Sequence, residues 1–91
     1  MKFLIINGPN LNLLGKREPG IYGDESYDAL CQMVKDYAAA HGSTADCFQS
    51  NHEGAIIDAI QQADGAYDAI VINPGAYTHY SYAILDALKA I

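Results

Sequence analysis

Short apolar runs alternate with helical patterns along this chain of 91 residues. The run from Phe3 to Ile6 is continuous and ends at Gly8-Pro9, which predicts a strand of a parallel sheet, buried on both faces. Residues 43–49 lie between two helical patterns and are interpreted as a second strand. Residues 67–72 predict a third strand, with residues 69–72 as its buried part.

Helical periodicity fills the segments between these strands. Residues 26–41 predict a helix that ends at Gly42, with one apolar stripe of Leu30, Val34, Tyr37 and either Ala38 or His41. The second helix is expected to begin with a capping box, in which Ser50 is the N-cap and Glu53 follows three residues later, and to end near Asp64. The inward residues of this helix and of a third, C-terminal helix are expected to be Ile56, Ile57, Ile60, Ala63, Tyr82, Leu85 and Leu88.

Two stretches interrupt the periodicity. Residues 7–23 follow the first strand and combine prolines, glycines and asparagines with Lys16, Arg17 and Tyr22. Residues 73–79 follow the third strand with a similar mixture. A hydrophobic core does not need such residues, so both stretches are candidate parts of a functional site.

The order of the elements predicts an α/β fold. Alternation of strands and helices indicates a parallel sheet with right-handed crossovers. We interpret it as a flavodoxin-like, doubly wound sheet of three α/β/α layers, in one domain that covers residues 1–91. The first strand then lies between the other two, and both special stretches meet at the C-terminal ends of the strands. Because such sheets usually have about five or six strands, we expect further sequence or another chain to complete the fold.

Charge restricts the possible partners. The net charge is −6, with 11 acidic residues against 5 Lys and Arg, which argues against nucleic acid and against an anionic membrane surface. No apolar run approaches the roughly 20 residues that span a bilayer, and the N-terminal run is too short for a signal peptide, so a cytoplasmic location is favoured.

Cys31 and Cys47 are expected to be reduced core thiols, and no metal-ligand spacing is present.

Tyr22 and Arg17 are the first candidates for chemistry. A tyrosine has a reference pKa of about 10 and is a poor base at neutral pH. A nearby guanidinium lowers that pKa, and a shift of about three units corresponds to roughly 4 kcal/mol of differential interaction. The pair would then remove a carbon-bound proton, from a loop that closes over the substrate on its glycines. The alternative, in which Tyr22 covers the core and Arg17 is solvated, stays open.

Asn73, Thr78 and His79 are candidates for ligand contact. Asn73 directly follows a buried strand, and His79 lies where the third helix is expected to begin. Free N–H groups at a helix N-terminus suit an anion or a hydroxyl-rich ligand. Capping of the helix by Thr78 or His79 is the alternative. Asp86 lies on the same helix face as His79, a position at which an acid is most often solvated.

Three segments resemble the motifs of type II 3-dehydroquinate dehydratases of the shikimate pathway. They are residues 7–23 (NGPNLNLLGKREPGIYG), residues 49–54 (QSNHEG) and residues 73–79 (NPGAYTH). The resemblance implies a flavodoxin-like fold and a dodecamer built as a tetramer of trimers. It also implies a lyase that removes water from 3-dehydroquinate to give 3-dehydroshikimate, by anti elimination through an enolate, without metal or cofactor.

The resemblance further implies catalytic roles for three residues. Tyr22 would take the proton next to the ketone. Arg17 would lower the pKa of Tyr22 and steady the enolate from the loop. Asn10 would help to hold a water molecule against the enolate oxygen.

Three more residues receive binding roles from the same resemblance. Asn73 and His79 would bind the hydroxyl-bearing ring of the substrate, and Asp86 would reach the site of a neighbouring subunit. Members of the family also have a general-acid histidine beyond these motifs, and neither His41, His52 nor His79 matches it. A polypeptide of these 91 residues alone is therefore expected to show negligible dehydration.

Two other functions remain open at the level of sequence. The chain can be a catalytically incomplete fragment or assembly module of the same fold, which binds partners through an unfinished sheet edge. It can also be a flavodoxin-like module that binds an anionic cofactor at the same edge. The missing phosphate-binding glycine patterns count against the second of these.

Overall fold

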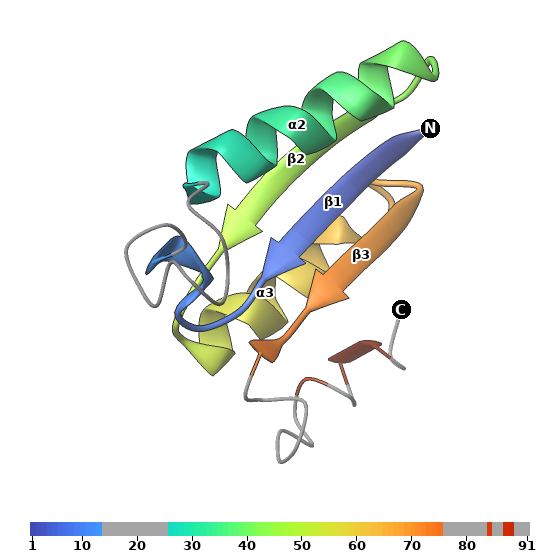
Figure 1. Ribbon diagram of the computed structural model, residues 1–91. Helices are drawn as coiled ribbons and strands as arrows, with labels where there is room; N and C mark the ends of the chain where they lie inside the picture. Colours follow the sequence, from blue (N-terminus) through green and yellow to red (C-terminus); the bar gives the residue numbers. More distant parts are fainter. Residues whose placement is uncertain (14–25, 76–83, 85–86, 89–91) are drawn as a thin grey trace.

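The chain forms a parallel sheet in the order β2-β1-β3 (Figure 1). The computed structural model describes residues 1–13, 26–75, 84 and 87–88. Within these, the strands are β1 (Lys2–Asn7), β2 (Thr44–Gln49) and β3 (Ala69–Asn73). The central position of β1 confirms the strand order expected for a flavodoxin-like sheet.

The register of the sheet aligns the C-terminal ends of all three strands. Asn7 lies opposite Gln49 on one side and opposite Asn73 on the other. The chain segments that follow β1 and β3 therefore start next to each other, although more than sixty residues separate them in sequence. The described first residues of the two special stretches therefore lie side by side, as predicted.

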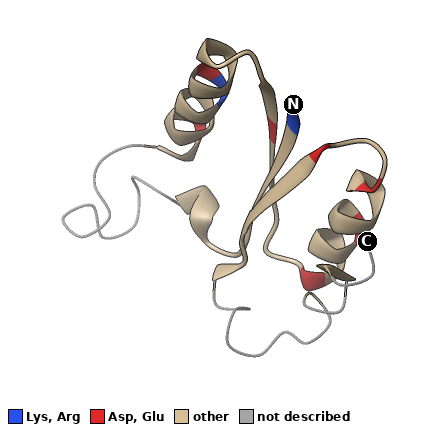
Figure 2. Cartoon of the chain, turned by 90° about the vertical axis from the view of Figure 1, so that its right-hand side faces the viewer, with Lys and Arg blue, Asp and Glu red and all other residues tan. Residues whose placement is uncertain are grey.

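Helices pack on both faces of the sheet (Figures 1 and 2). Helix α2 (Tyr27–Ala40) packs mainly against β2, and the side chain of Asn7 reaches its first residue from β1. Helix α3 (Glu53–Ala63) covers the opposite face, where it contacts Leu4 and Ile6. A short 3₁₀ helix, η1 (Leu11–Leu13), follows β1. The three layers are those expected from the alternation of strands and helices.

The boundaries of α2 agree with the sequence, but its apolar stripe differs. The hydroxyl of Ser26 accepts a hydrogen bond from the amide of Ala29 at 3.1 Å and caps the N-terminus. Tyr37 was expected to face the core, and this was wrong, because its side chain is 69% exposed and stacks on His41. The stripe instead continues through the half-buried Ala38, four residues after Val34.

The capping box expected at the start of α3 was wrong. The N-cap is His52, which makes no side-chain capping bond, and Glu53 is the first helical residue. The Ser50 amide donates to the carbonyl of Asn7 at 3.1 Å and continues the pairing with β1, so it is not available for the bond to Glu53 that a capping box requires. Its buried hydroxyl accepts from the amide of His52 at 3.0 Å and closes a turn before the helix.

The predicted burial of residues 69–72 in the third strand was wrong for Val71. Ile70 and Ile72 pack against the core cluster, but the side chain of Val71 on the opposite face is 53% exposed. The reason is the position of α2, which packs against β2 rather than β3. Within the described part of the chain, that face of β3 is left open.

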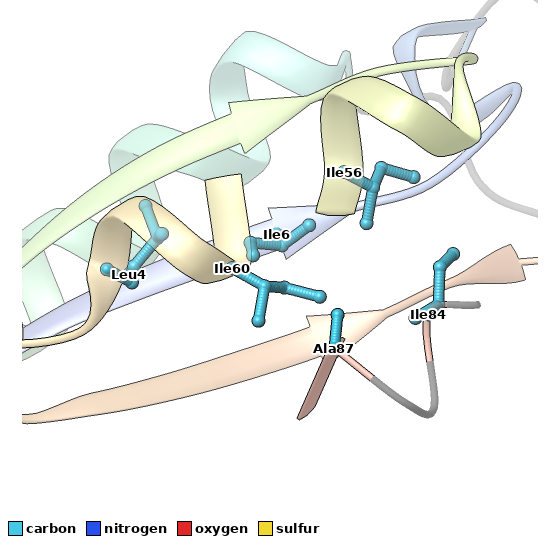
Figure 3. Packing of buried hydrophobic residues seen from close by; sticks show 7 residues of the cluster. Leu4, Ile6, Ile56, Ile60, Ile84 and Ala87 are labelled. Carbon is cyan, nitrogen blue, oxygen red and sulfur yellow. The ribbon is translucent and has the colours of Figure 1, made fainter. Parts of the chain in front are cut away.

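The hydrophobic core lies between the sheet and α3 (Figure 3). Its buried members are Leu4, Ile6, Ile56, Ile60, Ala63, Ile84 and Ala87. The inward residues predicted for α3 are confirmed, with Ile57 partly buried against the cluster. In the C-terminal segment, Leu88 packs on the core as predicted, and Ile84 and Ala87 are additional core residues. Tyr82 and Leu85 lie outside the described residues.

Truncation of a completely buried side chain of α3 should destabilise the fold. Ile60 is completely buried, so Ile60→Ala removes its packing and leaves a cavity. We expect a loss of about 2–5 kcal/mol in the free energy of unfolding, measured by urea denaturation. Gln61→Ala, at the exposed neighbouring position, is the control and should change stability by less than about 0.5 kcal/mol. Equal effects of the two changes would contradict this core assignment.

Candidate functional site

Three amide side chains stand in a row across the C-terminal edge of the sheet. They belong to Gln49, Asn7 and Asn73, the last residues of β2, β1 and β3. Asn7 is buried, Gln49 is half-buried and Asn73 is exposed. The edge at which ligands bind in open α/β sheets is thus lined with neutral hydrogen-bonding groups.

The segments after β1 and β3 touch backbone to backbone. The amide of Gly8 donates to the carbonyl of Asn73 at 2.7 Å. A Cβ atom on Gly8 would lie only 2.5 Å from the carbonyl oxygen of Pro74. Gly75 has φ +61, a conformation that L side chains rarely adopt. Glycine is therefore required at Gly8 by close approach and at Gly75 by conformation.

Asn10 adopts an unusual backbone conformation beside this contact. Its φ is 70°, in the left-handed region that asparagine tolerates better than most residues. Its amide donates to Oδ1 of Asn51 at 3.0 Å, and its carbonyl accepts from the amide of Leu13 at 3.0 Å. The residue as a whole is exposed, at the start of η1. The candidate catalytic residue Asn10 is thus held by its backbone at the C-terminal edge.

Gln49 and Asn51 belong to the motif at residues 49–54, but the sequence assigned neither of them a role in the site. Nε2 of Gln49 donates toward the carbonyl of Gly8 at 3.1 Å, Oδ1 of Asn51 at 3.2 Å and Oδ1 of Asn12 at 3.3 Å. These bonds join the end of β2 to the segment after β1. The available signal was the motif at residues 49–54, which begins with the last residue of β2.

The side chain of Asn73 is partly engaged in its own turn. Its Oδ1 accepts from the amide of Gly75 at 3.2 Å, the pattern of an Asx turn. This shapes the backbone at Pro74 and Gly75, where the chain meets Gly8 and Pro9. The oxygen of the Asn73 side chain thus already has one hydrogen-bond partner within its own turn.

A separate polar group lies between α2 and the sheet. It consists of Tyr27 and Cys31 of α2 and Cys47 of β2. The phenol oxygen of Tyr27 accepts a hydrogen bond from Nδ2 of Asn7 at 3.3 Å. Burial, followed by a hydrogen bond with Cys31, raises the pKa of Tyr27 to about 12. Burial, again with Cys31 as the next cause, raises the pKa of Cys47 to about 11. Both groups are neutral near pH 7, and both cysteines are free and half-buried.

Four predicted site residues lie outside the described residues, namely Arg17, Tyr22, His79 and Asp86, as does the alternative cap Thr78. Of the predicted site, the structure therefore places Asn10 and Asn73, which it brings to the same edge of the sheet.

Among the residues that it does describe, no group of three or more His, Cys, Asp or Glu side chains is arranged to hold a metal ion. No helix of this part is long and apolar enough to span a bilayer.

A groove of about 700 Å³ lies elsewhere, along the outer edge of β2 between α2 and α3. Its charged lining residues are Lys35, Asp46 and Asp58. Asn10 and Asn73, the two predicted site residues in the described part of the chain, do not line it. The groove is therefore not part of the candidate site at the C-terminal edge.

A methyl group at Gly8 should force the two loops apart. Gly8→Ala places a Cβ against the rigid Pro74 carbonyl, so we expect a loss of about 1–3 kcal/mol in the free energy of unfolding by urea denaturation. Gly54→Ala is the matched control. Nothing lies within 4 Å of its added Cβ in α3, and the change should stabilise by about 0.5–1 kcal/mol. An equally stabilising Gly8→Ala would contradict the close contact.

The raised pKa of Cys47 should appear in the pH dependence of stability. The folded-state pKa of about 11 exceeds the value of 9.0 for a free thiol, so folding favours the protonated form. The resulting stabilisation is complete below pH 9 and is lost as the pH rises through 11. We expect the free energy of unfolding to fall more steeply between pH 9 and 11 in the unchanged protein than in Cys47→Ala. Parallel curves would contradict this assignment.

Comparison with known proteins shows what this chain resembles. The model of the family described as Dehydroquinase class II matches residues 1–91. The chain is 58% identical over 92 residues to a 3-dehydroquinate dehydratase from Lachnospira eligens, and 55% identical over 91 residues to one from Thermotoga neapolitana. A solved type II dehydroquinase from Butyrivibrio crossotus DSM 2876 has a TM-score of 0.94 and 60% identity, over 99% of this chain. One from Propionibacterium acnes has a TM-score of 0.89 and 40% identity, over 94% of this chain.

The match extends over this whole chain but over only part of its relatives. The chain spans 63% of the Lachnospira eligens protein, 61% of the Thermotoga neapolitana protein and 63% of the Butyrivibrio crossotus structure. The shared fold is flavodoxin-like, with the parallel strand order described above. With the family model covering residues 1–91, this chain belongs to the class II dehydroquinase family.

Proposed function

We propose that this chain carries the proton-abstracting part of a 3-dehydroquinate dehydratase site. The observation that supports the proposal most strongly is the family match over residues 1–91, to relatives that are named for this reaction. The single domain expected for residues 1–91 supplies the strands β1 and β3 on which this part of the site is built. The reaction is a hydro-lyase step of the shikimate pathway and of aromatic amino acid biosynthesis.

The proposed reaction begins at the ketone of the substrate. The phenolate of Tyr22 takes a proton from the carbon next to the carbonyl, and the electron pair of that C–H bond forms an enolate. A water molecule held by Asn10 donates to the enolate oxygen. The enolate then collapses, the C–O bond to the leaving hydroxyl breaks, and an acid protonates that hydroxyl, which leaves as water. The acid is a histidine outside the family motifs present in these 91 residues.

The charge distribution of the described residues favours this assignment of Arg17. The ends of the three strands carry neutral amides, whereas the described Lys, Asp and Glu residues lie on the helices, on β2 and near the N-terminal ends of β1 and β3 (Figure 2). A guanidinium at this edge therefore meets no nearby carboxylate from the strand ends. Arg17 would lower the pKa of Tyr22, which must fall for Tyr22 to serve as a base.

The substrate is proposed to bind at the same edge of the sheet. The NH₂ group of Asn73 is directed to the hydroxyl-bearing ring of 3-dehydroquinate, and His79 contacts the same ring. Asp86 reaches the site of a neighbouring subunit in a dodecamer, a tetramer of trimers. The substrate is a small anion, and no organic cofactor or metal takes part. The net charge of −6 suits a cytoplasmic enzyme that contacts neither nucleic acid nor an anionic membrane.

Replacement of the proposed base should abolish most of the turnover. We expect Tyr22→Phe, in the full-length chain, to lower kcat by a factor of about 10²–10⁴, because the phenolate that removes the proton is gone. Turnover is followed by the absorbance of the conjugated enone product after addition of 3-dehydroquinate. Tyr37→Phe is the control, since Tyr37 is exposed on α2, and its activity should be unchanged.

Two outcomes would overturn the proposed function. One is the absence of enone formation by the unchanged full-length chain, whose length is checked by the mass of the intact polypeptide. The other is full activity of Tyr22→Phe. If Tyr22→Phe lost activity only because it is less stable, its urea unfolding midpoint would shift as well.

A further inference from the structure

Gln49 occupies a position from which one donor group reaches three oxygen atoms. Its NH₂ group lies 3.1 Å from the Gly8 carbonyl, 3.2 Å from Oδ1 of Asn51 and 3.3 Å from Oδ1 of Asn12. An NH₂ group has two hydrogens, so at least one of them is shared. The segments after β1 and after β2 thus converge on a single side chain.

The chemistry of these partners fixes the orientation of the Gln49 amide. The Gly8 oxygen belongs to the backbone and can only accept. Oδ1 of Asn51 also accepts from the backbone amide of Asn10 at 3.0 Å, which can only donate. Rotation of the Asn51 amide by 180° would break that bond. The position of Nε2 therefore requires a donor.

The same bonds determine the conformation of Asn10. A non-glycine residue with φ of 70° persists when its surroundings over-determine it. The amide of Asn10 is held by Asn51, its carbonyl is held by Leu13, and the side chain of Asn12 is drawn toward Gln49. Gln49 hydrogen-bonds to both Asn51 and Asn12, so it supports Asn10 through these two residues.

We propose that Gln49 is a positioning residue, which holds Asn10 in its left-handed conformation through Asn51 and Asn12. This inference rests on the proposed function, in which Asn10 holds a water molecule at the enolate oxygen. Gln49 itself touches no reacting atom. Its contribution is therefore expected in the step that forms the enolate rather than in the binding of the substrate.

The decisive variant is Gln49→Glu in the full-length chain. The change is nearly isosteric but places a carboxylate against the Gly8 carbonyl and the two asparagine oxygens. We expect kcat to fall about 10- to 100-fold with little change in KM, since a misplaced group costs up to about 100-fold in rate and Asn10 acts mainly on the transition state. Gln61→Glu, which adds the same charge at an exposed position of α3, should leave both parameters unchanged.

A pH profile separates positioning from a general loss of structure. Three nearby oxygens raise the pKa of the introduced carboxyl, and its protonated form donates one hydrogen bond again. The ratio of kcat for Gln49→Glu to kcat for the unchanged protein should therefore rise as the pH is lowered. Gln49→Met, which has no titratable group, should be slow at every pH and serves as the second variant where Gln49→Glu fails to fold.

A spectroscopic measurement tests the same inference without turnover. In the unchanged protein, Asn10 should give the strong amide-to-α-proton NOE of a positive φ and a slowly exchanging amide. Both signals should be lost in Gln49→Glu or Gln49→Met and kept in Gln61→Glu. Retention of both signals in the Gln49 variants, or loss of kcat without any change at Asn10, would overturn the proposal. An unchanged protein without turnover would count against the proposed function, and the NMR comparison would still decide the role of Gln49.

Discussion

The candidate site depends on the pairing of β1 with both of its neighbours. Alternation along β1 sends Leu4 and Ile6 to the core beneath α3, and Asn7, next in sequence, to the opposite face beside Tyr27. A slip of one residue would reverse these faces and bury Asn7 among isoleucines. The hydrophobic pattern of β1 thus fixes the register, and the register brings Gln49 and Asn73 to either side of Asn7.

Tyr27 illustrates how environment determines the chemistry of a tyrosine. Tyr27, the first residue of α2, has Asn7 and the cysteines as neighbours, and burial raises its pKa to about 12. That direction is the opposite of the one a general base requires. The role proposed for Tyr22 therefore needs a cation, and the strand ends offer neutral amides in the structure described here. Arg17 is the cation nearest to Tyr22 in the sequence, five residues before it.

Much of the fold could be predicted from patterns within single elements. Strand order, the ends of α2 and the inward residues of α3 follow from periodicity, capping by Ser26 and the stop at Gly42. The errors arose where packing against neighbouring elements determines whether a side chain is buried. Val71 is exposed because α2 lies over β2 instead of β3, and Tyr37 is exposed because the stripe of α2 runs through Ala38. For the site, the family resemblance identified Asn10, and its position after a strand identified Asn73. The motif at residues 49–54 includes Gln49, but only three-dimensional contacts give it a role.

The wrong prediction of a capping box at residues 50–53 has the same origin as the cluster around Gln49. By local rules Ser50 is a good N-cap, and loss of such a cap costs about 0.5–2 kcal/mol. The Ser50 amide pairs with Asn7 instead, and α3 starts two residues later without a side-chain cap. The intervening turn leaves Asn51 beside Gln49, where its oxygen binds the Asn10 amide. Local rules tend to fail at functional sites, and here the uncapped helix start accompanies a fixed geometry for Asn10.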